Sequence, residues 1–229
     1  MIAKLRGVGL VDDAGFSVHA GIISVLEAVA LRDRLSGVSR SRAGARHLMK
    51  HPDAAAIAID PRMLSLARDV LGATALPYRA TLFDKSAASN WLVTWHQDTA
   101  LPIRSRKDLE GWGPWSIKAG VNYAQAPAAA LEQIVALRLH LDDSTVENGP
   151  LRVIADSHRK GVLTDADISS LAANESAVDC LVRIGGVIRM RPLIVHASSK
   201  ATNGQPRRVL HIEYASSLLL VGNLELAIA

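Results

Sequence analysis

The chain has 229 residues, of which 49% are hydrophobic, and its 26 Lys and Arg against 22 Asp and Glu give a formal net charge of +4. Cys180 is the only cysteine, which excludes an intrachain disulfide and a cysteine-rich zinc site. The basic residues are spread along the chain, which argues against a nucleic-acid partner, and no stretch has the apolar length of a signal peptide or a membrane span. We therefore expect a soluble, cytoplasmic protein with one domain over residues 1–229.

The first third of the chain, about residues 1–74, has the pattern of helices. Apolar residues recur at helical spacing from Ile22 to Arg34, and Gly37 offers an end to that helix. Pro61 opens a second helical segment, which closes at Gly72. Residues 41–51 between them are expected to form a short helix or an irregular link.

From Ala75 onward, short β-rich runs alternate with turn signals such as Asn148-Gly149 and Gly185-Gly186. One helix, over residues 164–174 with Thr164 as its N-cap, interrupts this part. The predicted strands cover residues 78–83, 90–96, 116–124, 134–141, 151–154, 180–184, 187–190, 193–196 and 208–214. So many short strands over about residues 75–229 predict a β-sandwich or a barrel.

The predicted strand over residues 90–96 leads into the run WHQD, in which His96 and Asp98 are two positions apart. In an extended chain, residues at this spacing point to the same face, so both side chains can bind one metal ion. His140 and Asp142 have the same spacing. The motif alone therefore leaves two candidate sites.

His196, which ends the apolar run PLIVH, is the best candidate for a third ligand. Two imidazoles and one carboxylate on one face of an octahedron leave three positions open, and this is the ligand set of non-haem Fe(II) oxygenases. The open positions can take a bidentate oxoacid and dioxygen.

Three segments together resemble the phytanoyl-CoA dioxygenase family of Fe(II)- and 2-oxoglutarate-dependent oxygenases: WHQD, LHLDDSTVENGPLRVIADSHRKG and HASSKATNGQPRRVLHIEYA. The resemblance spans roughly residues 82–215, and its most specific part is a distal His followed eleven residues later by an Arg, here His196 and Arg207. The chain departs from the family where it reads ADSH, at residues 155–158, in place of PGSH. The resemblance implies a mainly β (α+β) fold: a double-stranded β-helix, or jelly-roll, cupin-like barrel, with the N-terminal helices packed outside.

The resemblance also implies that His96, Asp98 and His196 bind the metal. Counting predicted strands supports this choice, because the H-x-D strand and the distal-His strand are expected to pair across several intervening strands. Five predicted strands separate Asp98 from His196, but only three follow Asp142. His140 is then expected to be a strand histidine and Asp142 a turn cap, although this pair stays as the rival metal site.

A bound 2-oxoglutarate directs its second carboxylate away from the metal, and a buried Arg suits that carboxylate because its planar fork donates two hydrogen bonds. Arg207 and Arg208 face opposite sides of one strand, and alternation alone does not choose between them. The resemblance selects Arg207 and places Ser198 near the co-substrate. Weaker candidates for lining this pocket are Thr81, Lys85 and Asn122.

The segment after WHQD, residues 99–115, is expected to form a lip beside the iron. The candidate substrate contacts are Arg104, Arg106, Lys107, Trp112 and Trp115, together with His158 in the later ADSH run. Their charge favours a small, anionic substrate, although an exposed loop with structural tryptophans would give the same pattern.

The resemblance implies a dioxygenase that uses Fe(II), O2 and 2-oxoglutarate, releases succinate and CO2, and hydroxylates, or otherwise oxidises by hydrogen abstraction, a small organic substrate. The presence of Asp98 favours this outcome over halogenation, because related halogenases carry a small residue there. The alternative is a metal-binding cupin enzyme, an isomerase, lyase or dioxygenase that does not use 2-oxoglutarate. Such an enzyme would leave Arg207 unexplained.

Overall fold

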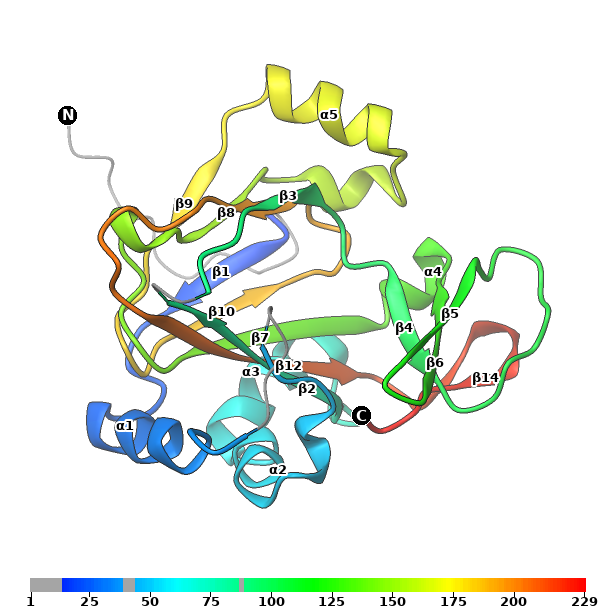
Figure 1. The fold of residues 1–229 in the computed structure, drawn as a ribbon. Helices are drawn as coiled ribbons and strands as arrows, with labels where there is room; N and C mark the ends of the chain where they lie inside the picture. Colours follow the sequence, from blue (N-terminus) through cyan, green and yellow to red (C-terminus); the bar gives the residue numbers. More distant parts are fainter. Residues whose placement is uncertain (1–13, 39–43, 87–88) are drawn as a thin grey trace.

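The computed structural model of the protein describes residues 14–38, 44–86 and 89–229 (Figure 1). The helices are α1 (Val25–Arg34), α2 (Pro52–Ala58), α3 (Pro61–Leu71), α4 (Ala128–Leu131) and α5 (Asp165–Asn174). The strands are β1 (Phe16–His19), β2 (Leu76–Lys85), β3 (Val93–His96), β4 (Ala100–Ile103), β5 (Trp115–Lys118), β6 (Val121–Gln125), β7 (Ile134–His140), β8 (Leu151–Val153), β9 (Val178–Cys180), β10 (Val187–Met190), β11 (His196–Ser198), β12 (Arg207–Ala215), β13 (Leu219–Leu220) and β14 (Leu224–Glu225).

Two antiparallel sheets face each other and form the double-stranded β-helix that the sequence predicts (Figure 1). The larger sheet has the strand order β1-β10-β7-β12-β2, and the smaller sheet has the order β3-β11-β8-β9. The chain passes between the two sheets repeatedly, so that β2, β7, β10 and β12 belong to the larger sheet and β3, β8, β9 and β11 to the smaller one. A third sheet, of β4, β6 and β5, extends from one end of the sandwich (Figure 1).

The N-terminal helices cover the outer face of the larger sheet, as expected for the described part of residues 1–74 (Figure 1). Met63 and Leu66 of α3 share one buried cluster with Leu137 of β7 and with Leu210 and Ile212 of β12. Each fully buried apolar side chain of this size contributes roughly 1.5–3 kcal/mol relative to its exposed state. No helix in the described ranges is both long enough and apolar enough to cross a membrane.

Helix α1 begins three residues later than the apolar pattern, because Ser24 and Glu27 form a capping box at its start. The Ser24 hydroxyl accepts from the Glu27 N–H (3.2 Å), and the Glu27 carboxylate accepts from the Ser24 N–H (2.7 Å). The buried face carries Ala28 and Leu31, whereas Leu26, which the pattern assigns to that face, is 81% exposed. Helices α3 and α5 start and stop where the sequence predicts, with Thr164 as the cap of α5.

Several strands differ from the prediction at their turns. The run 116–124 is a hairpin, β5 and β6, because Ala119 and Gly120 both have positive φ and reverse the chain. The strand expected over 193–196 begins only at His196, because the Ile194 N–H donates to the Arg191 carbonyl (3.1 Å) in a turn. Helix α2 and strands β1 and β4 were not predicted, since each is short and lacks a clear period.

Candidate metal centre

His96, Asp98 and His196 meet at one point between the two sheets. Strands β3 and β11 pair antiparallel, and this places His196 directly opposite His96. The candidate ligand atoms of the three side chains lie within 4.8 Å of one another, and this is the one such group among the residues described. Asp98 Oδ1 is 3.7 Å from His96 Nε2, and Asp98 Oδ2 is 3.5 Å from His196 Nε2. The three residues that the sequence selects are thus brought together.

Both imidazoles are oriented by backbone carbonyls. His96 Nδ1 lies 2.8 Å from the Thr94 carbonyl, and His196 Nδ1 lies 2.9 Å from the Ile194 carbonyl. A carbonyl oxygen only accepts, so each Nδ1 carries the hydrogen and each Nε2 turns its lone pair towards Asp98. Three electron-pair donors then face one another without a proton between them. This donor set fits a divalent cation.

The charges of the group favour metal binding. Burial, opposed by the nearby carboxylate of Asp98, lowers the pKa of His196 to about 4, so that this imidazole is neutral at pH 7. Burial alone would raise the pKa of Asp98, but the facing imidazoles of His196 and His96, with His211 and Arg79 beyond them, hold it well below its usual range. A neutral imidazole and an ionised carboxylate are the forms that bind metal.

Gln97 points away from the metal group, as the sequence predicts for a regular strand, and ties it to the rest of the fold. Its amide nitrogen donates to the carbonyls of Leu193 (2.6 Å) and Gly161 (2.9 Å), and its oxygen accepts from the Leu163 N–H (2.8 Å). The Asp98 N–H also donates to the Pro192 carbonyl (3.0 Å). These bonds fix the H-x-D segment against the turn that precedes His196.

Replacing Gln97 with Ala is expected to lower the free energy of unfolding by about 1–3 kcal/mol, because it leaves buried backbone groups without partners. Urea denaturation of the metal-free protein measures this loss. Gln205→Ala is the matched control, because its side chain is exposed and the variant should match the wild type within about 0.5 kcal/mol. Equal stability of Gln97→Ala and wild type would contradict the role given to this side chain.

The ADSH run contributes a positioning residue that the sequence analysis did not identify. Asp156 has φ 64°, a left-handed conformation, and the following Ser157 is buried. The Ser157 hydroxyl donates to the Ile154 carbonyl (2.6 Å) and accepts from the Val195 N–H (2.8 Å). Ser157 therefore holds the residue next to His196. The departure from PGSH marks the segment, but it does not indicate this bond.

At the other end of the same pocket lie two buried cations, Arg207 and Lys85, which are 4% and 1% exposed. Ser198 links them: its hydroxyl accepts from Lys85 Nζ (2.8 Å) and from Arg207 Nη2 (3.1 Å), and donates to the Gly149 carbonyl (2.8 Å). Arg207 Nη1 is buried and has no hydrogen-bond partner. No carboxylate in the described residues pairs with either cation. Burial and the nearby Arg138 lower the pKa of Arg207 to about 9.

Burial, together with the positive charges of Arg207 and Arg138, lowers the pKa of Lys85 to about 7 from its ordinary 10.5. Between these two values the unfolded chain binds more protons than the folded one, so the metal-free protein should become more stable as the pH rises from about 7 towards 10.5. Urea denaturation at several pH values in this window measures the rise. The rise should be smaller in Lys85→Met, and identical pH profiles of the two proteins would contradict the shift.

The rival pair does not form a metal site. Asp142 pairs with Arg208 (2.6 Å) and Arg32 (3.1 Å), rather than capping a turn. His140 is fully buried on the inner face of β7, where burial and the nearby Arg207 and Arg138 hold its pKa well below the usual value. Arg208 thus belongs to a surface ion-pair group outside the sandwich.

A row of charged side chains crosses the inner face of the larger sheet. Arg138 Nη1 donates to His211 Nδ1 (3.2 Å), which leaves the hydrogen on His211 Nε2, 3.4 Å from Glu213 Oε1. Glu213 in turn pairs with Arg79, whose Nη1 also donates to the Ala100 carbonyl (3.1 Å). Sequence analysis missed these residues, because alternating polar residues in a strand are typical of a solvated face.

Of the weaker predicted residues, Lys85 lines the metal pocket, whereas the others lie apart from it. Thr81 is buried beside His211 on β2 and β12, and Asn122 lies on β6; neither lines the cavity that holds the triad. Arg104 pairs with Glu225 at the surface (2.8 Å), and Trp112 is buried in an apolar cluster to which Trp115 adds at the edge. Trp112 and Trp115 thus pack in the structure.

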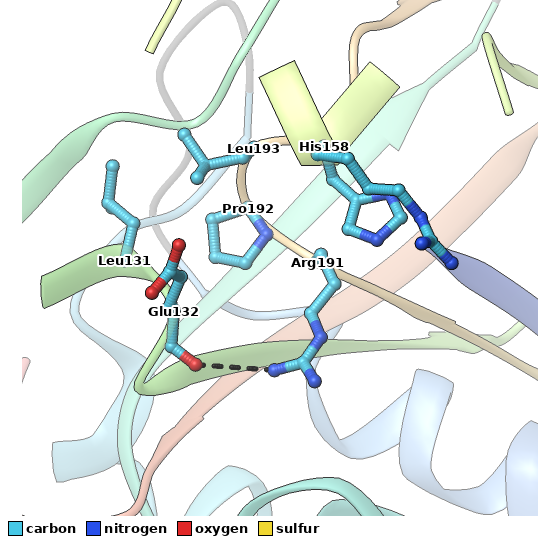
Figure 2. A pocket seen from close by; sticks show the side chains of 7 residues that line it. Leu131, Glu132, His158, Arg191, Pro192 and Leu193 are labelled. Carbon is cyan, nitrogen blue, oxygen red and sulfur yellow. Dashed lines mark hydrogen bonds between the residues drawn. The ribbon is translucent and has the colours of Figure 1, made fainter. Parts of the chain in front are cut away.

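His158 lines a second cavity, of about 330 Å³, which Figure 2 shows. Its other walls are Leu131, Glu132, Arg159, Arg191, Pro192 and Leu193. Arg191 Nη1 donates to the Glu132 carbonyl at this cavity (3.2 Å; Figure 2). Because the Pro192 carbonyl accepts from Asp98 N–H, the cavity adjoins the metal group but does not contain it.

The chain is similar to known proteins in sequence and in fold. The model of the phytanoyl-CoA dioxygenase family matches residues 31–209. The chain is 28% identical over 180 residues to L-proline trans-4-hydroxylase from Streptomyces griseoviridis, a match that covers 67% of this chain and 59% of that protein. The chain thus spans about three fifths of the length of this relative.

Solved structures show the same fold. EctD from S. alaskensis, in its apoform, aligns with a TM-score of 0.69 and 21% identity over 94% of this chain and 77% of that one. HygX from Streptomyces hygroscopicus, with nickel, 2-oxoglutarate and hygromycin B bound, aligns with a TM-score of 0.66 and 18% identity over 92% of this chain and 86% of that one.

Proposed function

The chain belongs to the phytanoyl-CoA dioxygenase family, and on that premise we propose that it is an Fe(II)- and 2-oxoglutarate-dependent dioxygenase. It would use O2 to hydroxylate, or otherwise oxidise by hydrogen abstraction, a small organic molecule. Two comparisons support the proposal: one relative is a proline hydroxylase, and HygX was solved with 2-oxoglutarate bound.

One observation carries the proposal: a single pocket holds three metal-donor side chains at one end and, at the other, two cations that pair with no carboxylate among the residues described. His96, Asp98 and His196 would hold Fe(II) as two imidazoles and one carboxylate, which leaves positions open for further ligands. When bound there, Fe(II) with 2-oxoglutarate and O2 supplies the oxidising chemistry, with succinate and CO2 as the co-products.

The residues of the chain would bind 2-oxoglutarate and orient it. Arg207, with its unpartnered Nη1, and Lys85 would bind the second carboxylate of 2-oxoglutarate, and Ser198 holds these two cations side by side. Burial keeps water from competing for that carboxylate, which strengthens the ion pair. His196 is buried while Asp98 is partly exposed, so a substrate would reach the three side chains from the Asp98 side.

The alternative is a cupin enzyme that holds a metal at the same three residues without 2-oxoglutarate. Such an enzyme would not explain why Arg207 and Lys85 lie together in a buried pocket, because burying two like charges without an anion costs free energy. The positive charge of the pocket instead favours an anionic co-substrate, and the same excess of charge favours an anionic substrate.

The proposal extends to the domain organisation and the cellular location of the protein. The N-terminal helices and the barrel would act as one oxygenase domain, because they share a continuous buried cluster. A cytoplasmic location is supported by the single cysteine, Cys180, which is buried and free.

Succinate formation tests the function directly. Protein incubated with Fe(II), ascorbate, O2 and 2-oxoglutarate is expected to form succinate slowly without a substrate and faster with one. Fe(II) binding without measurable affinity for 2-oxoglutarate would favour the cupin enzyme, and failure to bind Fe(II) would contradict both functions.

A further inference from the structure

Polar side chains from three separate segments surround the ring of Tyr123 on β6. His47 Nε2 lies 3.0 Å from the Tyr123 hydroxyl, and the two rings are stacked with their centroids 6.0 Å apart. Lys118 Nζ, from β5, is 4.7 Å from the centroid of the Tyr123 ring, and the guanidinium carbon of Arg79, from β2, is 5.8 Å from it. These residues are called the Tyr123 cluster below, together with Arg46, the exposed residue that precedes His47 in the chain.

The fold holds the segment that carries Arg46 and His47 against the larger sheet. Ala45 and Leu82 exchange two backbone hydrogen bonds, of 2.9 and 2.8 Å, so this segment lies along the edge of β2. His47 has φ 62°, an uncommon conformation for a residue with a β-carbon. Such a conformation persists where the surroundings determine it, and here the bond to the Tyr123 hydroxyl does so.

The Tyr123 cluster has an excess of positive charge. Arg79 pairs with Glu213, but neither Arg46 nor Lys118 makes an ion pair with a carboxylate of the described residues. Partial burial and the guanidiniums of Arg79 and Arg46 lower the pKa of Lys118, whereas Asp98 acts in the opposite direction. The cations are therefore crowded together.

The Tyr123 cluster and the Arg207 end of the pocket lie on opposite sides of the metal group. On the paired strands β2 and β12, Lys85 is opposite Arg207, and Arg79 is opposite Glu213, six residues further along. Six residues of extended chain span about 20 Å. The metal group lies between these two ends, because it shares a pocket with Arg207 and because Arg79 Nη1 donates to the carbonyl of Ala100 (3.1 Å), two residues after Asp98. A co-substrate bound at Arg207 would leave the Tyr123 cluster free.

We propose that Lys118 and Arg46, positioned beside Tyr123 and His47, bind an anionic group of the substrate, such as a carboxylate, phosphate or sulfate, while the carbon to be oxidised lies at the metal. This inference rests on the oxygenase function proposed above. The aromatic face of Tyr123 holds the Lys118 ammonium in place, and its hydroxyl is held by His47. The substrate class is thus a small oxyanion-bearing molecule.

Inorganic phosphate is the probe for this site. Calorimetric titration of the full chain, loaded with Mn(II) and 2-oxoglutarate at low ionic strength, is expected to show phosphate binding that weakens at least about fivefold in Lys118→Ala, which removes a partly buried charge, and by a smaller factor in Arg46→Ala, which removes an exposed one. Arg104→Ala is the matched control, since it removes one positive charge from an exposed pair with Glu225. Lys118→Arg should retain most of the affinity.

Paramagnetic broadening of the phosphate 31P signal by Mn(II) shows that the bound phosphate lies near the metal. This broadening should be smaller in Lys118→Ala and in Arg46→Ala than in the wild type. No phosphate binding, equal affinity in Lys118→Ala and wild type, or an equal loss in Arg104→Ala would overturn the inference. Mn(II) and 2-oxoglutarate binding, measured separately, should be unchanged in all variants. If the wild type binds neither, the proposed function fails, while phosphate titration of the metal-free chain still tests the cluster.

Discussion

Replacing Arg207 with Ala is expected to weaken 2-oxoglutarate binding by roughly 30-fold to 4,000-fold, because truncating one partner of a buried, hydrogen-bonded charge pair costs about 2–5 kcal/mol. Metal binding should be unchanged, since Arg207 lies at the far end of the pocket from the triad. Calorimetric titration of the Mn(II)-loaded protein with 2-oxoglutarate measures the loss.

The stability of the same variant provides a second, independent measurement. Without a bound anion, Arg207 is a buried cation beside Lys85, so its removal should not lower the melting temperature of the metal-free protein. Arg208→Ala is the matched control: it breaks the ion pair with Asp142 and should lower that temperature, but it should leave 2-oxoglutarate affinity unchanged. The opposite pattern would assign the co-substrate to Arg208.

Replacing Asp98 with Ala is expected to abolish succinate formation within the detection limit, because it removes the only carboxylate of the metal group and leaves two imidazoles to hold a divalent cation. Fe(II) affinity, measured by anaerobic titration, should fall by more than the roughly 10- to 100-fold that is typical of losing an outer-shell partner. Circular dichroism should show an intact fold, since the Asp98 side chain is partly exposed.

Asp142→Ala is the control for Asp98→Ala, because it removes a carboxylate from the rival H-x-D motif. It should destabilise the protein by leaving Arg208 and Arg32 without their partner, yet keep Fe(II) affinity and succinate formation. Retention of iron and turnover in Asp98→Ala, with loss of both in Asp142→Ala, would reverse the assignment of the metal site.

Much of the fold was predictable because its signals are local. Pro61 and Gly72 bound α3, Thr164 caps α5, and the alternation in β10 and β12 reflects residues that face two different layers. The short elements β1, β4 and α2 were missed, since pairing with distant strands, rather than their own pattern, decides their conformation. The packed face of α1 was also misassigned, because the capping box fixes where that helix begins.

The metal group could be predicted from the sequence, because two of its residues have a fixed spacing on one strand. The Tyr123 cluster could not, because its residues come from separate segments. His96 and Asp98 are two residues apart, and a strand of known period fixes their relation; His196 follows from the resemblance and from strand pairing. Arg46, Lys118 and Tyr123 come from segments whose meeting depends on a hairpin and on the edge of β2. No spacing in the sequence encodes that meeting.

The long ladder between β2 and β12 has a genetic consequence. Alternate residues of this pair face the inside of the sandwich, where Phe83, Lys85 and Arg207 line the pocket, and most of the intervening ones pack beneath the N-terminal helices. A single-codon insertion in the middle of either strand would turn Arg207 or Lys85 outward and bring leucines into the pocket, so that folding and chemistry would fail together. Insertions in the exposed turn near Asn203 change neither face, and related proteins should therefore vary in length there and keep a constant length along the ladder.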